Sequence, residues 1–278
     1  MRVRRPVYAF VVLLIIFGIL TGCGGKDSDI SKNKKMLIAA MELGHPPFEM
    51  TNSAGEPSGV GVDFVVALGE YIGKEVQVVN TARDSLVTSL QTSKADIVVT
   101  SVAIAGERAG DVDYSIPYAN SFLAILANKA SSVKSVGDIN MPGRKVAVIS
   151  GSPGQGFAEE NLRSAEIVAL PDESACVADV ALGAVDGFLC DQLAVYRNYR
   201  NNPGVTAVVS IPVQDPEYWC VAVKRGNTEL LKDINNFIGE FLADGGFDAL
   251  TVKYLNEEKI AFDEYGFKWF FDLVPCNT

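Results

Sequence analysis

Short runs of β-branched and apolar residues alternate, from residue 36 onward, with segments in which apolar residues recur every three or four positions. A short apolar run between turn residues is typical of a strand, and the longer period is typical of a helix. The pattern predicts strands at Met36–Met41, Glu75–Asn80, Asp96–Ser101, Phe122–Asn128, Lys145–Ser150, Glu166–Leu170, Gly187–Asp191, Thr206–Ile211 and Trp219–Lys224. Such alternation predicts an α/β protein whose parallel sheets are covered by helices.

The helical segments carry their apolar residues on one face. In Gly61–Ile72 that face holds Phe64, Val65 and Leu68, and Gly73 is placed to end the helix. Further helices are expected around Leu86–Leu90, Ala175–Leu182 and Leu230–Leu242, the last starting at Asn227-Thr228 and ending at Gly245-Gly246.

Two extended segments suggest that the chain builds two lobes. The β-α alternation restarts at Lys145 after residues 121–128, and residues 218–224 precede the last helices. If both segments are crossovers, the chain leaves lobe one, builds lobe two and returns. Ligands bind beyond the carboxyl ends of strands in open α/β sheets, so we expect the site in the cleft between the lobes. The expected parts are 36–122 with 224–278 for lobe one, 128–215 for lobe two, and crossovers at 123–127 and 216–223.

The first residues indicate targeting rather than fold. A basic start is followed by an apolar run, Val7–Leu20, that is short for a spanning helix of about 20 residues. Leu20-Thr21-Gly22-Cys23 resembles a bacterial lipoprotein signal, which implies cleavage after residue 22 and a lipid on Cys23. The alternative is an uncleaved anchor helix. In both cases the polar segment 23–35 is a tether, and the remainder lies in the cell envelope outside the cytoplasmic membrane.

Composition narrows the function classes. The 278 residues include 24 Lys and Arg against 34 Asp and Glu, with a formal charge of −10. Nucleic-acid binding draws largely on Lys and Arg, so this balance argues against it. The chain has one His, His45, and no C-x-x-C pair, so we expect neither a metal site nor a cofactor. Disulfides are permitted outside the cytoplasm, but the sequence does not decide whether Cys176, Cys190, Cys220 and Cys276 form them.

Five motifs in order resemble one protein family, over nearly all of residues 36–262. They are Pro46-Pro47-Phe48-Glu49; Gly59 to Phe64; Asp96 to Ser101 with Glu107-Arg108 and Asp113 to Tyr118; Gly151-Ser152-Pro153-Gly154; and Gly183 to Asp191. Together they resemble the bacterial extracellular solute-binding proteins of the polar amino-acid type, the capture components of ABC importers. The resemblance implies a two-lobed, type II periplasmic-binding-protein fold, a free amino acid as ligand, a membrane permease as partner and a monomeric state.

A free amino acid carries a carboxylate and an ammonium group, and charges that leave water must be paired. Arg108 matches the carboxylate-binding Arg of the family, and Asp191 matches its ammonium-binding carboxylate. The simpler alternatives are a surface ion pair of Arg108 with Glu107 or Asp111, and a solvated turn position for Asp191.

Other positions are expected to contact the ligand less specifically. Thr100, Ser101 and Ser152 lie where backbone N–H groups can hold the carboxylate. Ala103 stands where the family often has Ser or Thr, so one hydroxyl contact is expected to be missing.

The side-chain end of the ligand is harder to assign. Phe48 belongs to the proline-phenylalanine turn. His45 stands where the family often has a stacking aromatic, and it can stack or serve as a turn residue. Arg83 can read an acidic or amide side chain or lie in solvent, whereas Glu42 can contact a cationic side chain or pair with Arg83. Arg83 and Glu42 favour ligand side chains of opposite charge, so the sequence does not identify the amino acid. Trp219 and Tyr218 are expected to pack at the crossover rather than to bind the ligand.

The resulting hypothesis is a lipid-anchored binding protein that closes on a polar amino acid and delivers it to the permease. One alternative is a cyclic-acid dehydratase on the same scaffold, which would need a buried general acid such as Asp191 or Glu173. The other is a sensory amino-acid receptor.

Overall fold

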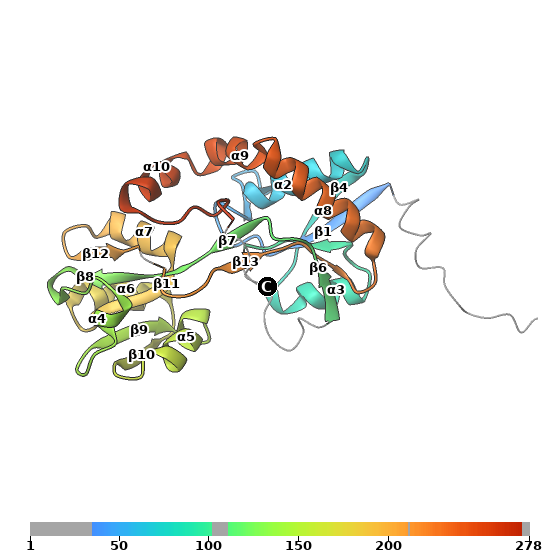
Figure 1. Ribbon diagram of the computed structural model, residues 1–278. Coiled ribbons are helices and arrows are strands. Elements are labelled where there is room, and N and C mark those ends of the chain that lie inside the picture. Colours follow the sequence, from blue (N-terminus) through green and yellow to red (C-terminus); the bar gives the residue numbers. More distant parts are fainter. Residues whose placement is uncertain (1–34, 102–110, 211, 274–278) are drawn as a thin grey trace, which may run out of the picture. The chain divides into compact units, whose positions relative to one another are not determined.

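A pair of five-stranded sheets organises the residues that the computed structural model describes, which are 35–101, 111–210 and 212–273. Each sheet carries its own helices, and together they form two lobes (Figure 1). The mixed α/β class and the two lobes confirm the predicted fold. No helix in these described ranges is long and apolar enough to cross a membrane.

The sheet of lobe one combines strands from both ends of the chain. Its order is β4 (Glu75–Asn80), β1 (Met36–Met41), β5 (Ile97–Val98), β14 (Ala222–Lys224) and β6 (Val112–Tyr114). The first three strands are parallel, and β14 is antiparallel to both of its neighbours.

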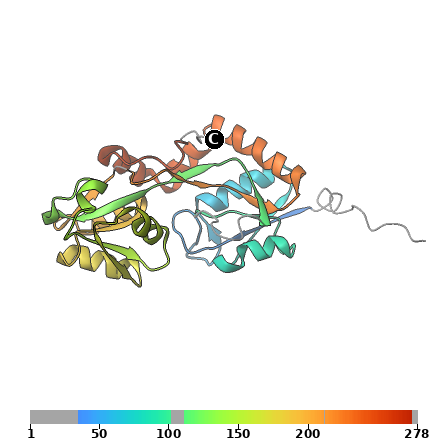
Figure 2. The same cartoon turned by 60° about the horizontal axis from the view of Figure 1, so that its bottom comes forward.

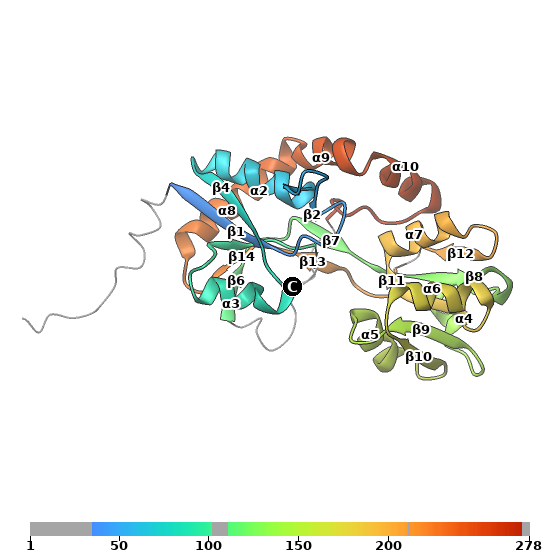
Figure 3. The ribbon, with the colours of Figure 1, turned by 180° about the vertical axis from the view of Figure 1, so that it is seen from behind.

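Helices cover both faces of this sheet. They are α2 (Val60–Tyr71), η1 (Arg83–Ser85), α3 (Leu86–Gln91), α8 (Thr228–Ala243) and α9 (Gly246–Tyr254). Helix α10 (Asn256–Tyr265) follows α9 and contacts lobe two, through the ring of Phe262 against Tyr196 and the ion pair of Glu257 with Arg200. Figures 1 and 3 show α2 and α8 on one side and α3 on the other. Leu37 and Met41 of β1 join the core that contains α2, whereas Ala40 joins the core that contains α3. A parallel strand buried on both faces explains the nearly continuous apolar run in its sequence.

The sheet of lobe two has the order β10 (Glu166–Leu170), β9 (Lys145–Ile149), β11 (Gly187–Asp191), β8 (Leu123–Asn128) and β12 (Thr206–Val209). Strands β10, β9 and β11 are parallel, and β8 is antiparallel to β11 and β12. Its helices are η3 (Lys129–Ser131), α4 (Val136–Ile139), α5 (Pro153–Asn161), α6 (Glu173–Leu182) and α7 (Gln192–Asn201).

A two-stranded ladder lies between the lobes. Strand β7 (Ala119–Ser121) pairs antiparallel with β13 (Glu217–Trp219), so two segments far apart in sequence run side by side (Figure 2). The predicted single strand over 219–224 is therefore two strands, β13 in this ladder and β14 in the sheet of lobe one. A small hairpin of β2 (Met50–Thr51) and β3 (Pro57–Ser58) completes the strands of the described ranges.

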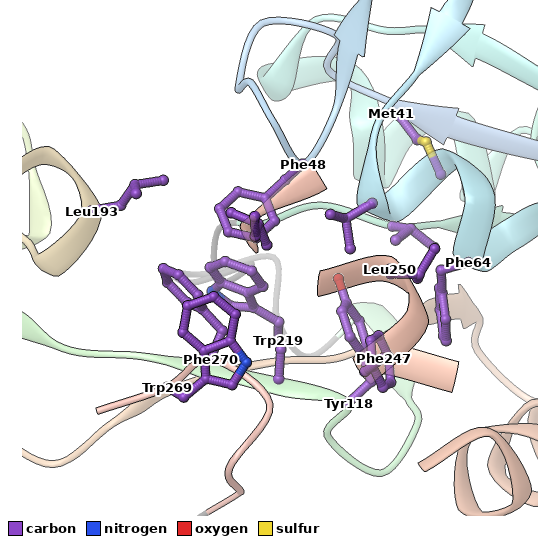
Figure 4. Close-up of a cluster of buried hydrophobic side chains, with 14 of the residues drawn as sticks. Met41, Phe48, Phe64, Tyr118, Leu193, Trp219, Phe247, Leu250, Trp269 and Phe270 are labelled. Atoms are coloured by element: carbon purple, nitrogen blue, oxygen red, sulfur yellow. The ribbon is translucent and has the colours of Figure 1, made fainter. Parts of the chain in front are cut away.

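Aromatic rings form the part of the core nearest to the site (Figure 4). The ring of Phe48 meets those of Trp219 and Phe270 edge to face, with centroids 4.8 and 5.1 Å apart. Trp219 and Phe270 stack on each other at 5.6 Å. Each such ring pair stabilises the folded protein by about 0.5–1.5 kcal/mol beyond the effect of its buried area. They fix the turn after β1 against β13.

The turn after β1 also depends on a glycine. Gly59 has φ +122°, and a Cβ there would collide with the backbone carbonyl of Phe48. Only glycine permits this close approach of α2 to the turn. The Gly59-to-Phe64 motif thereby sets where Phe48 lies.

Candidate functional site

A cavity of about 460 Å³ is lined by residues of both lobes, of β7 and of β13. This volume falls within the range of small-molecule pockets. The lining comes from the turn after β1, from η1, from the ends of β5, β9 and β11, and from the starts of α5, α6 and α7. Trp219 and Phe270 contribute aromatic surface. Trp219 packs in the crossover ladder as predicted, and it also faces the cavity.

Asp191 lies at the carboxyl end of β11 and caps α7. Its Oδ1 accepts hydrogen bonds from the backbone N–H groups of Leu193 and Ala194, both at 3.0 Å. The carboxylate is open to the cavity, but the protein that surrounds it raises its pKa by desolvation. The charge of Glu173 adds to that rise, and the two backbone hydrogen bonds oppose it. Within the described residues, Oδ2 has no hydrogen-bond donor, so the group can accept one from a ligand.

The Gly151-Ser152-Pro153-Gly154 turn places the start of α5 at the cavity. The Ser152 hydroxyl accepts a hydrogen bond from the backbone N–H of Gln155 at 3.2 Å, and Pro153 opens the helix. A Cβ on Gly154 would lie 2.7 Å from the backbone carbonyl oxygen of Leu189, so only glycine lets α5 pack this closely on β11. A helix start of this kind attracts an anion.

The structure brings most of the predicted contact residues to one place. His45, Phe48, Arg83, Ser101, Ser152 and Asp191 all line the cavity. Arg108, Ala103 and the lipidation residue Cys23 lie outside the described residues.

Glu42 and Thr100 stand behind the cavity wall. Glu42 Oε2 lies 3.0 Å from Nε2 of His45, so it supports that ring. Thr100 is buried, and its carbonyl oxygen accepts a hydrogen bond from the Tyr118 hydroxyl at 3.2 Å.

Three charged residues line the cavity although no motif marked them as contacts for an amino-acid ligand: Glu173, Arg197 and Glu217. Glu173 Oε1 accepts from the Asn198 side chain at 2.6 Å. Arg197 of α7 donates to the Pro46 carbonyl oxygen at 2.9 Å, which links lobe two to the turn after β1. Glu217 comes from β13, and no pattern in the sequence around it indicates a binding role.

Glu49 is a buried carboxyl group directly behind Ser101. It is 1% exposed, and it accepts hydrogen bonds from the Ser101 hydroxyl at 2.6 Å and the Ser101 backbone N–H at 3.2 Å. Burial raises its pKa to about 7, against the effect of these two bonds, and the nearby charge of Glu42 raises it further. Gly61 leaves the room for this carboxyl group, since a Cβ there would lie 2.6 Å from Glu49 Oε1.

Glu49→Gln is expected to remove a pH-dependent loss of stability. The pKa of Glu49 is about 7 in the folded protein against an ordinary 4.5, so its ionisation opposes folding. The native protein should therefore lose about 2–3 kcal/mol from this group between pH 5 and pH 8. The variant lacks that loss and should be the more stable protein at pH 8. Urea unfolding at both pH values measures the difference.

Glu160→Gln, at an exposed position on α5, is the matched control and should keep the native pH dependence. An equal loss of stability in Glu49→Gln and the native protein would contradict the buried, pH-sensitive state of Glu49.

The two thiols of lobe two are poor nucleophiles. Cys176 and Cys190 are buried, and burial raises the pKa of Cys176 to about 11 and that of Cys190 well above its ordinary value. A thiol in such surroundings stays protonated and inert. Among the described residues, no group of three or more His, Cys, Asp and Glu side chains is arranged to hold a metal ion.

A two-lobed α/β fold with a polar and aromatic cavity lined from both lobes defines a type II periplasmic binding protein. Residues 37–257 match the bacterial extracellular solute-binding proteins, family 3, and the chain belongs to this family. It is an amino-acid-binding protein of the ABC-transporter class.

The relatives agree with this assignment. The chain is 28% identical to the L-cystine-binding protein TcyJ of Escherichia coli (strain K12), with 92% of this chain and 96% of TcyJ covered. It is 30% identical to the crystal structure of an ancestral amino-acid-binding protein described as a precursor of cyclohexadienyl dehydratase, with a TM-score of 0.64 over 81% of this chain and 97% of that one. It is 26% identical to the unliganded, open L-cystine solute receptor of Neisseria gonorrhoeae, with a TM-score of 0.68 over 84% and 98%.

Proposed function

We propose that this protein captures a polar amino acid between its lobes and hands it to an ABC permease while anchored to the membrane through a lipid on Cys23. The observation that carries the binding role is the position of Asp191, a carboxylate at the end of β11 that faces a cavity lined by both lobes. The proposed anchor follows from the resemblance of the first 23 residues to a lipoprotein signal.

In this proposal the two ends of the amino acid bind different lobes. The ammonium group binds Asp191, and the carboxylate binds Arg108, assisted by the start of α5 at Ser152. Ser101 lines the cavity, but its hydroxyl and its backbone N–H both donate to Glu49. A ligand that contacts both lobes stabilises the closed arrangement over the open one, because only the closed state offers both sets of contacts. We place the hinge in the ladder of β7 and β13, because residues 123–127 of the expected crossover pair within the sheet of lobe two as part of β8. The ligand side chain would lie toward Phe48, with the positions of Ala103 and His45 shaping its surroundings.

The names of the relatives limit the candidate ligands. Two of those described above are named for L-cystine. Others are named for arginine and histidine, which supports a polar amino acid. All of these relatives are named as binding proteins or a receptor. The dehydratase alternative, with Asp191 or Glu173 as its general acid, is not favoured, because these relatives are named for binding.

A thermal-shift screen of the purified protein against the twenty common L-amino acids and L-cystine tests this proposal. A ligand present at 100 times its Kd should stabilise the native state by about 2.7 kcal/mol and raise the melting temperature. The D-enantiomer of the most effective ligand is the matched control and should give a much smaller rise. The absence of a shift with every amino acid would contradict the proposed function.

A further inference from the structure

Arg83 and Glu217 form a second pair of opposite charges on the cavity wall. Arg83 comes from η1 in lobe one, and Glu217 comes from β13 between the lobes. Neither side chain makes a hydrogen bond or an ion pair with any residue in the described ranges. Arg197, the other arginine on the wall, is already occupied by the Pro46 carbonyl oxygen and by Glu258.

Arg83 and Glu217 line the same cavity, and the charge of Arg83 acts on Glu217. Burial raises the pKa of Glu217, and the positive charge of Arg83 opposes that rise. A guanidinium and a carboxylate that face one cavity without pairing leave room for a ligand between them. A ligand group that carries both charges would satisfy both residues with charge-assisted hydrogen bonds.

A ligand side chain that carries a single charge could pair with only one of Arg83 and Glu217. An acidic side chain on Arg83 would face the like charge of Glu217, and a cationic side chain on Glu217 would face the like charge of Arg83. Each arrangement costs free energy when the closed cavity excludes water. A second α-amino-acid head, with its own carboxylate and ammonium group, fits both residues.

The cavity offers a second carboxylate for the second ammonium group of such a ligand. In a molecule with two α-amino-acid heads joined through a disulfide, the two α-carbons are about 4.4–6.8 Å apart. Its two ammonium groups therefore need two carboxylates that are near neighbours. Asp191 and Glu217 both line this cavity and are carboxylates available for these two groups.

We propose that the cavity takes an amino acid with two α-amino-acid heads, such as L-cystine or its thioether analogue, with the second head bound by Arg83 and Glu217. This inference rests on the proposed function, which places the first head on Asp191. The apolar linker between the heads lies against the aromatic surface of Phe48 and Trp219. Arg83 and Glu217 thereby determine specificity for the length and second head of the ligand.

Calorimetric titration with L-cystathionine and S-methyl-L-cysteine tests the inference. Cystathionine has two heads and no reducible bond, and S-methylcysteine has one head with a similar thioether. The native protein should bind cystathionine at least about ten-fold more tightly. Arg83→Gln and Glu217→Gln should each weaken cystathionine binding by about ten-fold or more and change S-methylcysteine binding by less than about two-fold.

The matched controls are Arg225→Gln and Glu160→Gln, which remove the same charges from exposed positions outside the cavity and should leave both affinities unchanged. Melting temperatures establish that each variant is folded, and Arg83→Met provides a second replacement at the exposed position in η1. Equal affinity for the two ligands, or no loss in the Arg83 and Glu217 variants, would overturn this inference and leave the proposed function standing. Failure of every amino acid to bind would overturn both.

Discussion

Asp191→Asn is expected to weaken binding of the cognate amino acid by about 3–5 kcal/mol, the usual cost of leaving a buried charge without its partner. The neutral amide keeps the shape of the side chain but cannot pair with the ligand ammonium. Asparagine caps a helix about as well as aspartate, so α7 should persist and the melting temperature should stay near that of the native protein. Calorimetric titration measures the first effect and thermal unfolding the second.

Two further variants separate the binding role of Asp191 from its structural role. Asp191→Ala should lose the same affinity and also about 1 kcal/mol of stability, because it removes the cap. Asp172 is the matched control, since it caps α6 in the same lobe through a hydrogen bond from the Ala175 N–H and lies outside the cavity wall. Asp172→Asn should leave binding unchanged. Native affinity in Asp191→Asn would show that the ammonium group binds elsewhere.

Arg108→Ala is expected to cost a similar 3–5 kcal/mol of binding free energy, because the ligand carboxylate loses a bidentate partner in a cavity that excludes water. The start of α5 would remain, but neutral donors alone do not replace a guanidinium. Arg108→Lys keeps the charge without the planar fork and should fall between the native protein and Arg108→Ala. Calorimetric titration with the best ligand of the thermal-shift screen measures all three.

The control for this series is Arg225→Ala, which removes an exposed arginine outside the cavity wall. Its affinity should equal that of the native protein. Unchanged affinity in Arg108→Ala would refute the assignment of Arg108 to the ligand carboxylate.

Strands β1, β4, β10 and β11 have the predicted bounds. Burial within the sheet selects apolar residues in β1 and β11, whereas the edge strands β4 and β10 are marked by their β-branched residues. Helix α7 was missed, because Gln, Asn and Arg make up half of its ten residues. The aspartate that precedes it was the available signal, because an N-cap position marks a helix start.

The same distinction holds for the site. His45, Ser101, Ser152 and Asp191 follow or end predicted strands, and strand ends converge on the cavity in this fold. Glu217 reaches the cavity because β13 pairs with β7, about a hundred residues earlier in the chain. Patterns over a few neighbouring residues do not predict which distant strands pair. The same limit applies to Glu49, whose burial depends on the room left by Gly61.

A crystal structure of the protein with the amino acid that most raises its melting temperature is the most direct test of the central claim. We expect the ligand in the cavity between the lobes, with its ammonium group within hydrogen-bond distance of the Asp191 carboxylate and its carboxylate on the Arg108 guanidinium. A ligand bound outside this cavity, or one whose ammonium and carboxylate contact neither residue, would contradict it.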